Sequence, residues 1–361
     1  DKPLLISSLL DYAAKYHGGT EIVSRTIEGP IHRYTYADAE IRAKKLAKAL
    51  QALGVEAGDR VATLAWNGYR HYELYYGVSG MGAICHMINP RLFPGQVAYI
   101  MNHAEDTLVF ADLTFLELLE TIAPDTSTVK GFVIMTDEAN MPETALPNVY
   151  CYETLLAVQD DDYDWPQFDE YTASSMCYSS GTTGNPKGVL YSHRSTVLHA
   201  WSAATPDMLG IAARDTVLPV VPMFHVNAWG LPYTATMIGA KLVLPGMKMD
   251  GESIHELIND EGVTFSAGVP TVWLGLLDYL EKSGKKVPSF ERCVIGGSAT
   301  PRAMILEMEE KYDVNVIHAW GMTEMSPLGT ANWPKHGMED ETVDERIDRR
   351  EIGRASCRES V

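Results

Sequence analysis

The chain of 361 residues is 46% hydrophobic and 21% charged, and its 48 acidic and 29 basic residues give a formal net charge of −19 at pH 7. This composition is typical of a globular protein with more than one folding unit, and the acidity argues against nonspecific nucleic-acid binding, which requires a basic surface. No apolar run reaches the ~18 residues of a membrane span and no signal peptide is visible, so we expect no membrane partner. The five cysteines are scattered and include no Cys-x-x-Cys pair, so neither disulfides nor a zinc site is suggested. We therefore expect a protein of the reducing cytoplasm.

From residue 34 onward, segments with apolar residues at helical spacing alternate with short apolar segments that predict strands. Residues 36–53 are predicted to form a helix with Ile41, Leu46 and Leu50 on its apolar face and Gly54 as its C-cap. Further helices are expected at 71–81 and 94–101, and strands at 59–65, 83–88, 107–111 and 130–135.

A second series of the same kind follows residue 215. Its strands are expected at 216–221, 241–244, 263–267, 292–295 and 315–318, and its helices at 251–259, 272–281 and 302–311. Alternating strands and helices predict parallel sheets covered by helices, so we expect an α/β fold of two stacked mixed α/β subdomains. The acidic, aromatic stretch 159–169 is the expected linker, which gives subdomains at 1–165 and 166–333 and a charged tail at 334–361.

Residues 178–188 have the sequence Tyr-Ser-Ser-Gly-Thr-Thr-Gly-Asn-Pro-Lys-Gly, which predicts a phosphate-binding loop. Glycines let the backbone approach a ligand closely, amide and hydroxyl groups converge on phosphate oxygens, and Lys187 adds a positive charge. An ordinary turn would explain the Gly, Asn and Pro residues but not the hydroxyls and the lysine together. The P-loop of NTPases is excluded, because Pro186 precedes the lysine and Gly188 follows it.

Three further segments follow in order: Pro-Met-Phe-His-Val-Asn-Ala-Trp-Gly at 222–230, Gly-Gly-Ser-Ala at 296–299, and His-Ala-Trp-Gly-Met-Thr-Glu at 318–324. Together with the loop they resemble the adenylate-forming superfamily, which contains acyl-CoA synthetases, firefly-type luciferases and the adenylation domains of peptide synthetases. The resemblance covers nearly all of the chain up to about residue 330. It implies the large N-terminal adenylation domain of that family, with Trp320 in place of the tyrosine in its Tyr-Gly-x-Thr-Glu motif.

The resemblance implies an ATP-dependent acid–CoA ligase, AMP-forming, that uses ATP, Mg²⁺ and coenzyme A as co-substrate. A carboxylate attacks the α-phosphorus of ATP, pyrophosphate leaves, and the thiol of coenzyme A takes the acyl group from the acyl-adenylate. The protein has to neutralise the triphosphate and place the carboxylate in line, and no protein nucleophile is required.

Site residues follow from the same resemblance. Thr182, Thr183, Gly184 and Lys187 would hold the β- and γ-phosphates, and Ser179, Ser180 and Gly181 of the same loop belong to the expected cofactor-binding set. Ser179 and Glu324 would ligate Mg²⁺, and Thr323 would contact the α-phosphate. The expected adenine slot consists of Gly297, Ser298, Ala299, His318, Ala319, Trp320, Gly321 and Met322, with Trp320 stacking on the base. The expected catalytic set is His225, Lys187, Thr323 and Glu324.

The expected substrate pocket consists of His225, Val226, Trp229, Gly296 and Gly297. No acidic residue lies in 224–226 to pair with an ammonium, so a free amino acid is not expected. The bulk of Trp229 limits depth and favours short or medium acyl chains. The motifs look most like the medium-chain acyl-CoA ligase branch, which includes 3-methylmercaptopropionate-CoA ligases, and a thioether suits an apolar, polarizable slot.

Plainer interpretations stay open for single residues: a core histidine or core tryptophan at 225 and 229, a strand-to-helix turn at 296–297, and a helix-start carboxylate at 324. Two other functions also stay open, a noncatalytic nucleotide-binding module and a luciferase-like adenylating oxygenase. The residues are silent on oligomeric state, but dimers are common in the family and a homodimer is therefore one expectation.

Beyond residue 334 the family has a Thr-Gly-Asp segment and a small mobile C-terminal lid domain with a lysine, and neither is found in this sequence. We interpret the lid domain as absent and the charged tail as truncated or non-native, above all at 351–361. A natural short protein with a disordered tail is the alternative.

Overall fold

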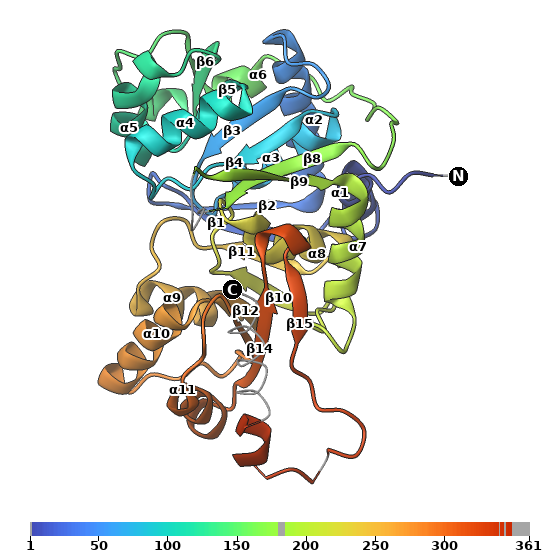
Figure 1. Cartoon of the computed structure of the whole chain (residues 1–361), viewed down its shortest axis with the longest axis vertical. Helices are drawn as coiled ribbons and strands as arrows, with labels where there is room; N and C mark the ends of the chain where they lie inside the picture. The colour runs from blue at the N-terminus through green and yellow to red at the C-terminus, as the bar shows by residue number, and fades with distance from the viewer. Residues whose placement is uncertain (1, 180–184, 339, 343, 349–361) are drawn as a thin grey trace.

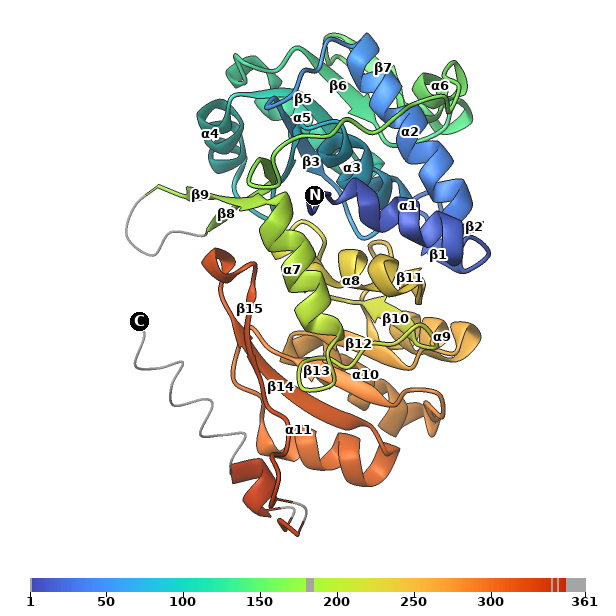
Figure 2. The same ribbon diagram turned by 90° about the vertical axis from the view of Figure 1, so that its right-hand side faces the viewer.

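The computed structural model describes residues 2–179, 185–338, 340–342 and 344–348. Two sheets lie one above the other, with a layer of helices between them and further helices on the outer faces (Figures 1 and 2). This is the α/β architecture of two stacked subdomains that the alternation predicts. No helix in the described ranges is long and apolar enough to cross a membrane.

Within the described residues the first sheet has seven strands. In spatial order they are β7 (Val149–Cys151), β6 (Gly131–Ile134), β5 (Asp106–Ala111), β3 (Arg60–Leu64), β4 (Ile84–Met87), β8 (Ala173–Ser179) and β9 (Lys187–Ser192). All neighbours are parallel except β8 and β9, which form an antiparallel hairpin. Successive side chains point to opposite faces, so Phe110 packs toward the central layer and Val109 toward the outer one. The outer face is covered by α4 (Pro94–Ala104) and α5 (Leu116–Ile122), and the inner face by α2 (Tyr36–Ala52), α3 (Tyr69–Gly80) and α6 (Tyr152–Ala157).

The second sheet has eight strands in the part of the chain that the structure describes. In spatial order they are β15 (Leu328–Ala331), β14 (Asn315–Gly321), β13 (Arg292–Ile295), β12 (Phe265–Gly268), β10 (Thr216–Pro219), β11 (Lys241–Leu244), β1 (Glu21–Arg25) and β2 (Ile31–Thr35). The sheet is parallel except at its two ends, where β15 and β2 pair antiparallel. The outer helices are α9 (Gly251–Glu261), α10 (Pro270–Ser283) and α11 (Arg302–Leu306), which continues into the π-helical turn η5 (Glu307–Lys311). The central layer is completed by α1 (Ser7–Tyr16), α7 (His193–Ala204) and α8 (Leu231–Ile238).

Strand pairing does not follow the expected division at residue 165. The hairpin β8–β9 comes after that point but belongs to the first sheet, next to β4. The hairpin β1–β2 comes before it but belongs to the second sheet, next to β11. The chain on each side of residue 165 therefore contributes one hairpin to the edge of the sheet that the other side mainly forms.

One local expectation also needs correction. Ile41 is 39% exposed, because the buried stripe of α2 runs through Ala39, Ala43, Leu46 and Leu50 and leaves residue 41 off that face. Within the expected tail, residues 344–348 form a helical turn whose Ile347 is fully buried beside α11. Residues 349–361 lie outside the described residues.

Candidate active site

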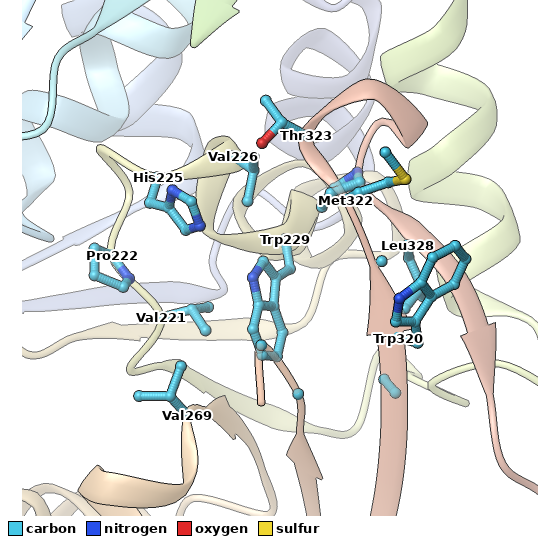
Figure 3. Close-up of a pocket in the computed structure, with 15 residues that line it drawn as sticks. Val221, Pro222, His225, Val226, Trp229, Val269, Trp320, Met322, Thr323 and Leu328 are labelled. Carbon is cyan, nitrogen blue, oxygen red and sulfur yellow. The ribbon is translucent and has the colours of Figure 1, made fainter. Parts of the chain in front are cut away.

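A cavity of about 290 Å³ opens at the carboxyl ends of β12, β13 and β14 (Figure 3). In parallel α/β sheets this edge is where ligands bind, because the loops after neighbouring strands meet there. The residues that line it are Val221, Pro222, His225, Val226, Trp229, Val269, Gly296, Gly297, Ala319, Trp320, Gly321, Met322, Thr323, Pro327 and Leu328.

One wall of the cavity is an unusual left-handed turn. Val226, Asn227, Ala228 and Trp229 have φ values of 42°, 56°, 49° and 55°, and Gly230 follows with 76°. Each non-glycine residue in this region costs roughly 1–2 kcal/mol, so the turn must be held by its surroundings. The Nδ2 group of Asn227 donates to Oγ of Ser175 in β8 at 3.2 Å. No right-handed helical turn covers these residues, and α8 begins only at Leu231.

His225 and Trp229 nevertheless both point into the cavity, from the two ends of this turn (Figure 3). A Cβ atom on Gly296 would lie 3.1 Å from Cη2 of Trp229 and 2.8 Å from the carbonyl oxygen of Ala319. A Cβ atom on Gly297, whose φ is +76°, would lie 3.9 Å from Cζ2 of the same ring. The two glycines are thus the floor on which the indole ring rests, and the ring limits the depth of the cavity.

His225 is exposed at the cavity mouth, although partial desolvation by the surrounding wall lowers the pKa of its imidazole below the usual value. The ring is therefore mainly neutral at neutral pH, in which form one nitrogen donates and the other accepts. A neutral donor at this place can bond an oxygen of a bound carboxylate or phosphate without leaving a buried charge when the ligand departs.

The opposite wall is the hairpin of β14 and β15. A Cβ atom on Gly321 would lie 2.2 Å from the carbonyl oxygen of Pro327, so this strand crossing needs glycine. The ring of Trp320 packs over Gly329, beside Leu328, and in Figure 3 it lies apart from Trp229. The stacking role expected for Trp320 stays a prediction.

The short 3₁₀ turn η6 (Thr323–Met325) connects the cavity to the phosphate-loop hairpin. The buried hydroxyl of Tyr191 in β9 donates to the carbonyl oxygen of Thr323 at 2.6 Å. In the same hairpin, Ser179 and Lys187 are paired across β8 and β9, and Oγ of Ser179 donates to the carbonyl oxygen of Lys187 at 3.4 Å. The side chains of Lys187 and Glu324 are exposed, so both are free to turn toward a ligand.

The structure therefore brings most of the expected residues to one place. The five expected pocket residues line the cavity, as do Ala319, Trp320, Gly321, Met322 and Thr323 of the expected nucleotide set. Residues near the cavity that do not line it are Ser298, Ala299, His318 and Glu324, and the expected phosphate ligands Ser180, Gly181, Thr182, Thr183 and Gly184 lie outside the described residues.

Five lining residues were not expected: Val221, Pro222, Val269, Pro327 and Leu328. Val269 directly follows β12, so its place beside Gly297 follows from the rule that strand ends of a parallel sheet meet at one edge. Pro327 and Leu328 belong to the return strand of the β14–β15 hairpin, for which the sequence carries no periodic signal.

Comparison with known proteins identifies the family. Residues 10–356 match the family described as AMP-binding enzyme. The chain is 54% identical to a medium-chain-fatty-acid–CoA ligase of Ectopseudomonas oleovorans, over 95% of this chain and 63% of that protein. It is also 54% identical to a 3-methylmercaptopropionyl-CoA ligase of Ruegeria lacuscaerulensis, over 92% of this chain and 62% of that protein.

Solved structures show the same fold. The anthranilate CoA ligase AuaEII, in complex with anthranoyl-AMP, matches 92% of this chain and 63% of its own with a TM-score of 0.83 at 23% identity. The N-terminal domain of FACL13 from Mycobacterium tuberculosis matches 91% of this chain and 79% of its own with a TM-score of 0.76. The chain spans somewhat less than two thirds of the length of these curated relatives. Because the family model matches nearly the whole chain, the chain belongs to the family of AMP-binding enzymes.

Proposed function

We propose that the protein of which this chain is part is an AMP-forming acid–CoA ligase, which converts a carboxylic acid and ATP into an acyl-adenylate and pyrophosphate and then into a thioester. The observation that carries the proposal is one cavity in which His225 and Trp229 face the 296–297 glycine pair and the 319–323 strand end. An acyl-adenylate needs a binding surface for its acyl group directly beside a binding surface for its adenylate group. The names of the curated relatives support the same reaction class.

In this proposal the chain contributes binding and charge rather than a nucleophile. The neutral imidazole of His225 would donate to an oxygen of the carboxylate or the α-phosphate, and the backbone and hydroxyl of Thr323 would orient that phosphate. Lys187 would neutralise part of the triphosphate charge as pyrophosphate departs. Tyr191 supports this arrangement, because it ties Thr323 to the strand that begins at Lys187.

The residues also fit a magnesium ion that is bound mainly through phosphate oxygens. No group of three or more His, Cys, Asp or Glu residues that could hold a metal occurs among the described residues. Mg²⁺ in nucleotide sites commonly takes one or two protein oxygens together with phosphates and water, and Ser179 and Glu324 would supply a hydroxyl and a carboxylate. The ion would reduce the charge that develops on the leaving pyrophosphate.

The test is ATP–pyrophosphate exchange on this chain and on a version extended to the length of its relatives, with a panel of short and medium carboxylic acids. We expect acid-dependent exchange that Lys187→Ala lowers, while Lys130→Ala, at an exposed lysine on the far edge of the first sheet, leaves it unchanged. Nucleotide binding with no exchange in either form would instead support the noncatalytic nucleotide-binding module.

For the substrate, we propose a short or medium acyl chain such as 3-methylmercaptopropionate. The cavity is lined mainly by apolar side chains and backbone, and the indole ring of Trp229 limits its depth. The test compares kcat/KM for 3-methylmercaptopropionate, butyrate and octanoate in the extended form. A tenfold advantage for octanoate would remove the thioether acid as the preferred substrate.

We further propose a homodimer that buries the outer face of α1 and α7. Tyr12 and Tyr16 of α1 and Leu198 and Trp201 of α7 are exposed, at 46%, 62%, 38% and 66%. The two helices begin next to each other, where Nδ1 of His193 accepts the N–H of Ile6. Exposed aromatic groups of this kind are typical of interfaces. Light scattering after size exclusion should give twice the chain mass, and Trp201→Ser should lower it; a monomer at micromolar concentration would contradict the proposal.

The remaining partners and the location are also proposals. The free cysteines Cys85, Cys177 and Cys293 are buried, which suits a reducing cytoplasm. The net charge of −19 disfavours nucleic acid as a partner.

A further inference from the structure

We propose that Asn67 and Tyr75, which lie in the first subdomain outside the cavity, are positioning residues for the acyl side of the site. They fix the backbone of residues 219–223, which leads from β10 to His225 and to the left-handed turn. The proposal rests on the proposed function, because it concerns how the acyl group of the adenylate is seated.

Asn67 lies in the connection between β3 and α3 and is fully buried. Its Nδ2 group donates to the carbonyl oxygens of Pro219 and Val221, both at 2.8 Å, and its Oδ1 atom accepts the N–H of Met223 at 2.7 Å. An amide side chain has two N–H donors and one carbonyl acceptor, so all of its groups are used on this one segment. No hydrophobic or acidic side chain of similar size offers two N–H donors and one carbonyl acceptor.

Tyr75, in α3, holds the same segment from a second position. Its fully buried hydroxyl donates to the carbonyl oxygen of Met223 at 2.5 Å. The backbone N–H and C=O groups of Met223 are therefore both bonded to side chains of the first subdomain. This matters because β10 ends at Pro219, and beyond it the segment is no longer part of the regular sheet ladder.

The held segment forms the cavity wall and carries the turn. Val221 and Pro222 line the cavity, and His225 follows Met223 by two residues. The four left-handed residues that come next are unfavourable by themselves, so their conformation depends on fixed ends. Asn67 and Tyr75 fix the end before the turn, and Asn227 bonds to Ser175 within it. We infer that loosening the first anchor displaces His225 and Trp229 while leaving the nucleotide wall, formed by β14 and β15, in place.

The test separates acyl seating from nucleotide binding. Calorimetry on the 361-residue chain measures Kd for AMP and for butyryl-sulfamoyl-adenosine, a stable mimic of a short acyl-adenylate, and the ratio of the two Kd values gives the acyl advantage. Tyr75→Phe keeps the ring and removes only the hydroxyl. We expect it to lower the acyl advantage by about fivefold to tenfold, the range of one lost buried hydrogen bond, with Kd for AMP unchanged within about twofold.

The matched control is Tyr36→Phe. The hydroxyl of Tyr36 is also fully buried and also donates to a backbone carbonyl, that of Ala240 at 2.7 Å, but Ala240 lies at the far end of α8. This variant should lose similar stability and keep the full acyl advantage. Asn67→Asp, whose carboxylate would face two carbonyl oxygens without a donor, should lose the acyl advantage more strongly; if it does not fold, Tyr75→Phe still decides the question.

The outcomes are distinguishable. A wild-type chain that binds AMP and the acyl mimic equally would overturn both the proposed function and this inference. A wild-type chain that prefers the mimic, with Tyr75→Phe and Tyr36→Phe alike in their ratios, would overturn the inference alone.

Discussion

Removal of the indole ring at Trp229 should lengthen the acyl group that the cavity accepts. The ring lines the cavity together with His225, and it lies 3.1 Å and 3.9 Å from Cβ atoms placed on Gly296 and Gly297. Trp229→Ala replaces that ring with empty, apolar space. The variant should therefore gain affinity for longer acids and lose little for acids that never reach the ring.

The size of the effect follows from the burial of methylene groups. Each methylene seated in apolar space contributes about 0.8 kcal/mol, which is about fourfold in affinity at 25 °C. Octanoate has four more methylenes than butyrate, so the upper limit of the change in their ratio is about 3 kcal/mol, or about 200-fold. Partial collapse of the wall into the vacated space reduces this, and we expect a change of at least about tenfold.

The assay is pyrophosphate exchange, or the binding of acyl-sulfamoyl-adenosines, with butyryl, hexanoyl, octanoyl and decanoyl groups. Trp201→Ala is the control: this tryptophan is 66% exposed on α7, so the same side chain is lost away from the cavity. Its chain-length profile should equal that of the wild type. If Trp229→Ala keeps the wild-type profile as well, the acyl group does not run toward the indole ring, and the assignment of this cavity to the acyl chain is refuted.

Four further predictions concern charge, packing and pH. Lys187→Ala should weaken ATP binding by about 1.5–3 kcal/mol, the value of a charge-assisted hydrogen bond, and should leave AMP binding nearly unchanged in calorimetry. Glu324→Gln should raise the Mg²⁺ concentration needed for half-maximal exchange, and an unchanged Mg²⁺ dependence would refute its role as a ligand. Gly296→Ala places a methyl group 2.8 Å from a strand carbonyl and 3.1 Å from an indole ring, so urea unfolding should show a loss of about 1–3 kcal/mol together with weaker acyl binding. Burial lowers the pKa of His193 to about 4, and its Nδ1 accepts the N–H of Ile6. The unfolded state therefore binds a proton more readily than the folded state. The contribution of His193 to the free energy of unfolding is complete above pH 6.5 and is lost as the pH falls toward 4. Asn at this position keeps an acceptor but does not titrate. Between pH 7.5 and pH 5, the free energy of unfolding of His193→Asn should therefore fall by about 1–2 kcal/mol less than that of the wild type, as measured by urea unfolding.

The parts of the fold that the sequence predicts are those in which local pattern and tertiary structure agree. The strands β11 and β13 have the expected bounds, because short apolar runs between polar segments form the centre of a parallel sheet. The meeting of 296–297 with 319–323 also follows, since the first segment comes directly after β13 and the second covers the carboxyl end of the neighbouring parallel strand β14. The expected pocket residues gather for that reason.

The sequence does not predict which sheet receives the two hairpins. Nothing local distinguishes β1 as a partner of β11, some 220 residues later in the chain, from a partner of its own subdomain's strands. The choice is made by packing: Ile22 faces the central layer and Val23 the outer helices of the second sheet, so the strand is buried on both faces only there. Such a pairing depends on the assembled core rather than on the pattern of the strand itself.

The left-handed turn is hidden from the sequence for a related reason. Residues 226–229 contain no glycine and include Ala228, the residue with the highest helix propensity, so nothing local marks a left-handed turn. The backbone departs from a right-handed helix because the segment before the turn is bonded to Asn67 and Tyr75 and the turn itself to Ser175. These contacts are worth more together than the helical turn that they replace.

The same contacts explain why the site lies where the two subdomains meet. The cavity wall that follows β10 is bonded to Tyr75 of α3, and the wall that follows β14 is bonded to Tyr191 of β9. Each wall therefore has one side in the second sheet and its hydrogen-bonded support in the first subdomain. Because a buried polar group left without its partner costs more than the bond contributes when formed, neither wall can keep its conformation if the subdomains separate. The geometry of the cavity is thus a property of the packed pair, and the central helix layer, the part of the core that both sheets share, maintains it.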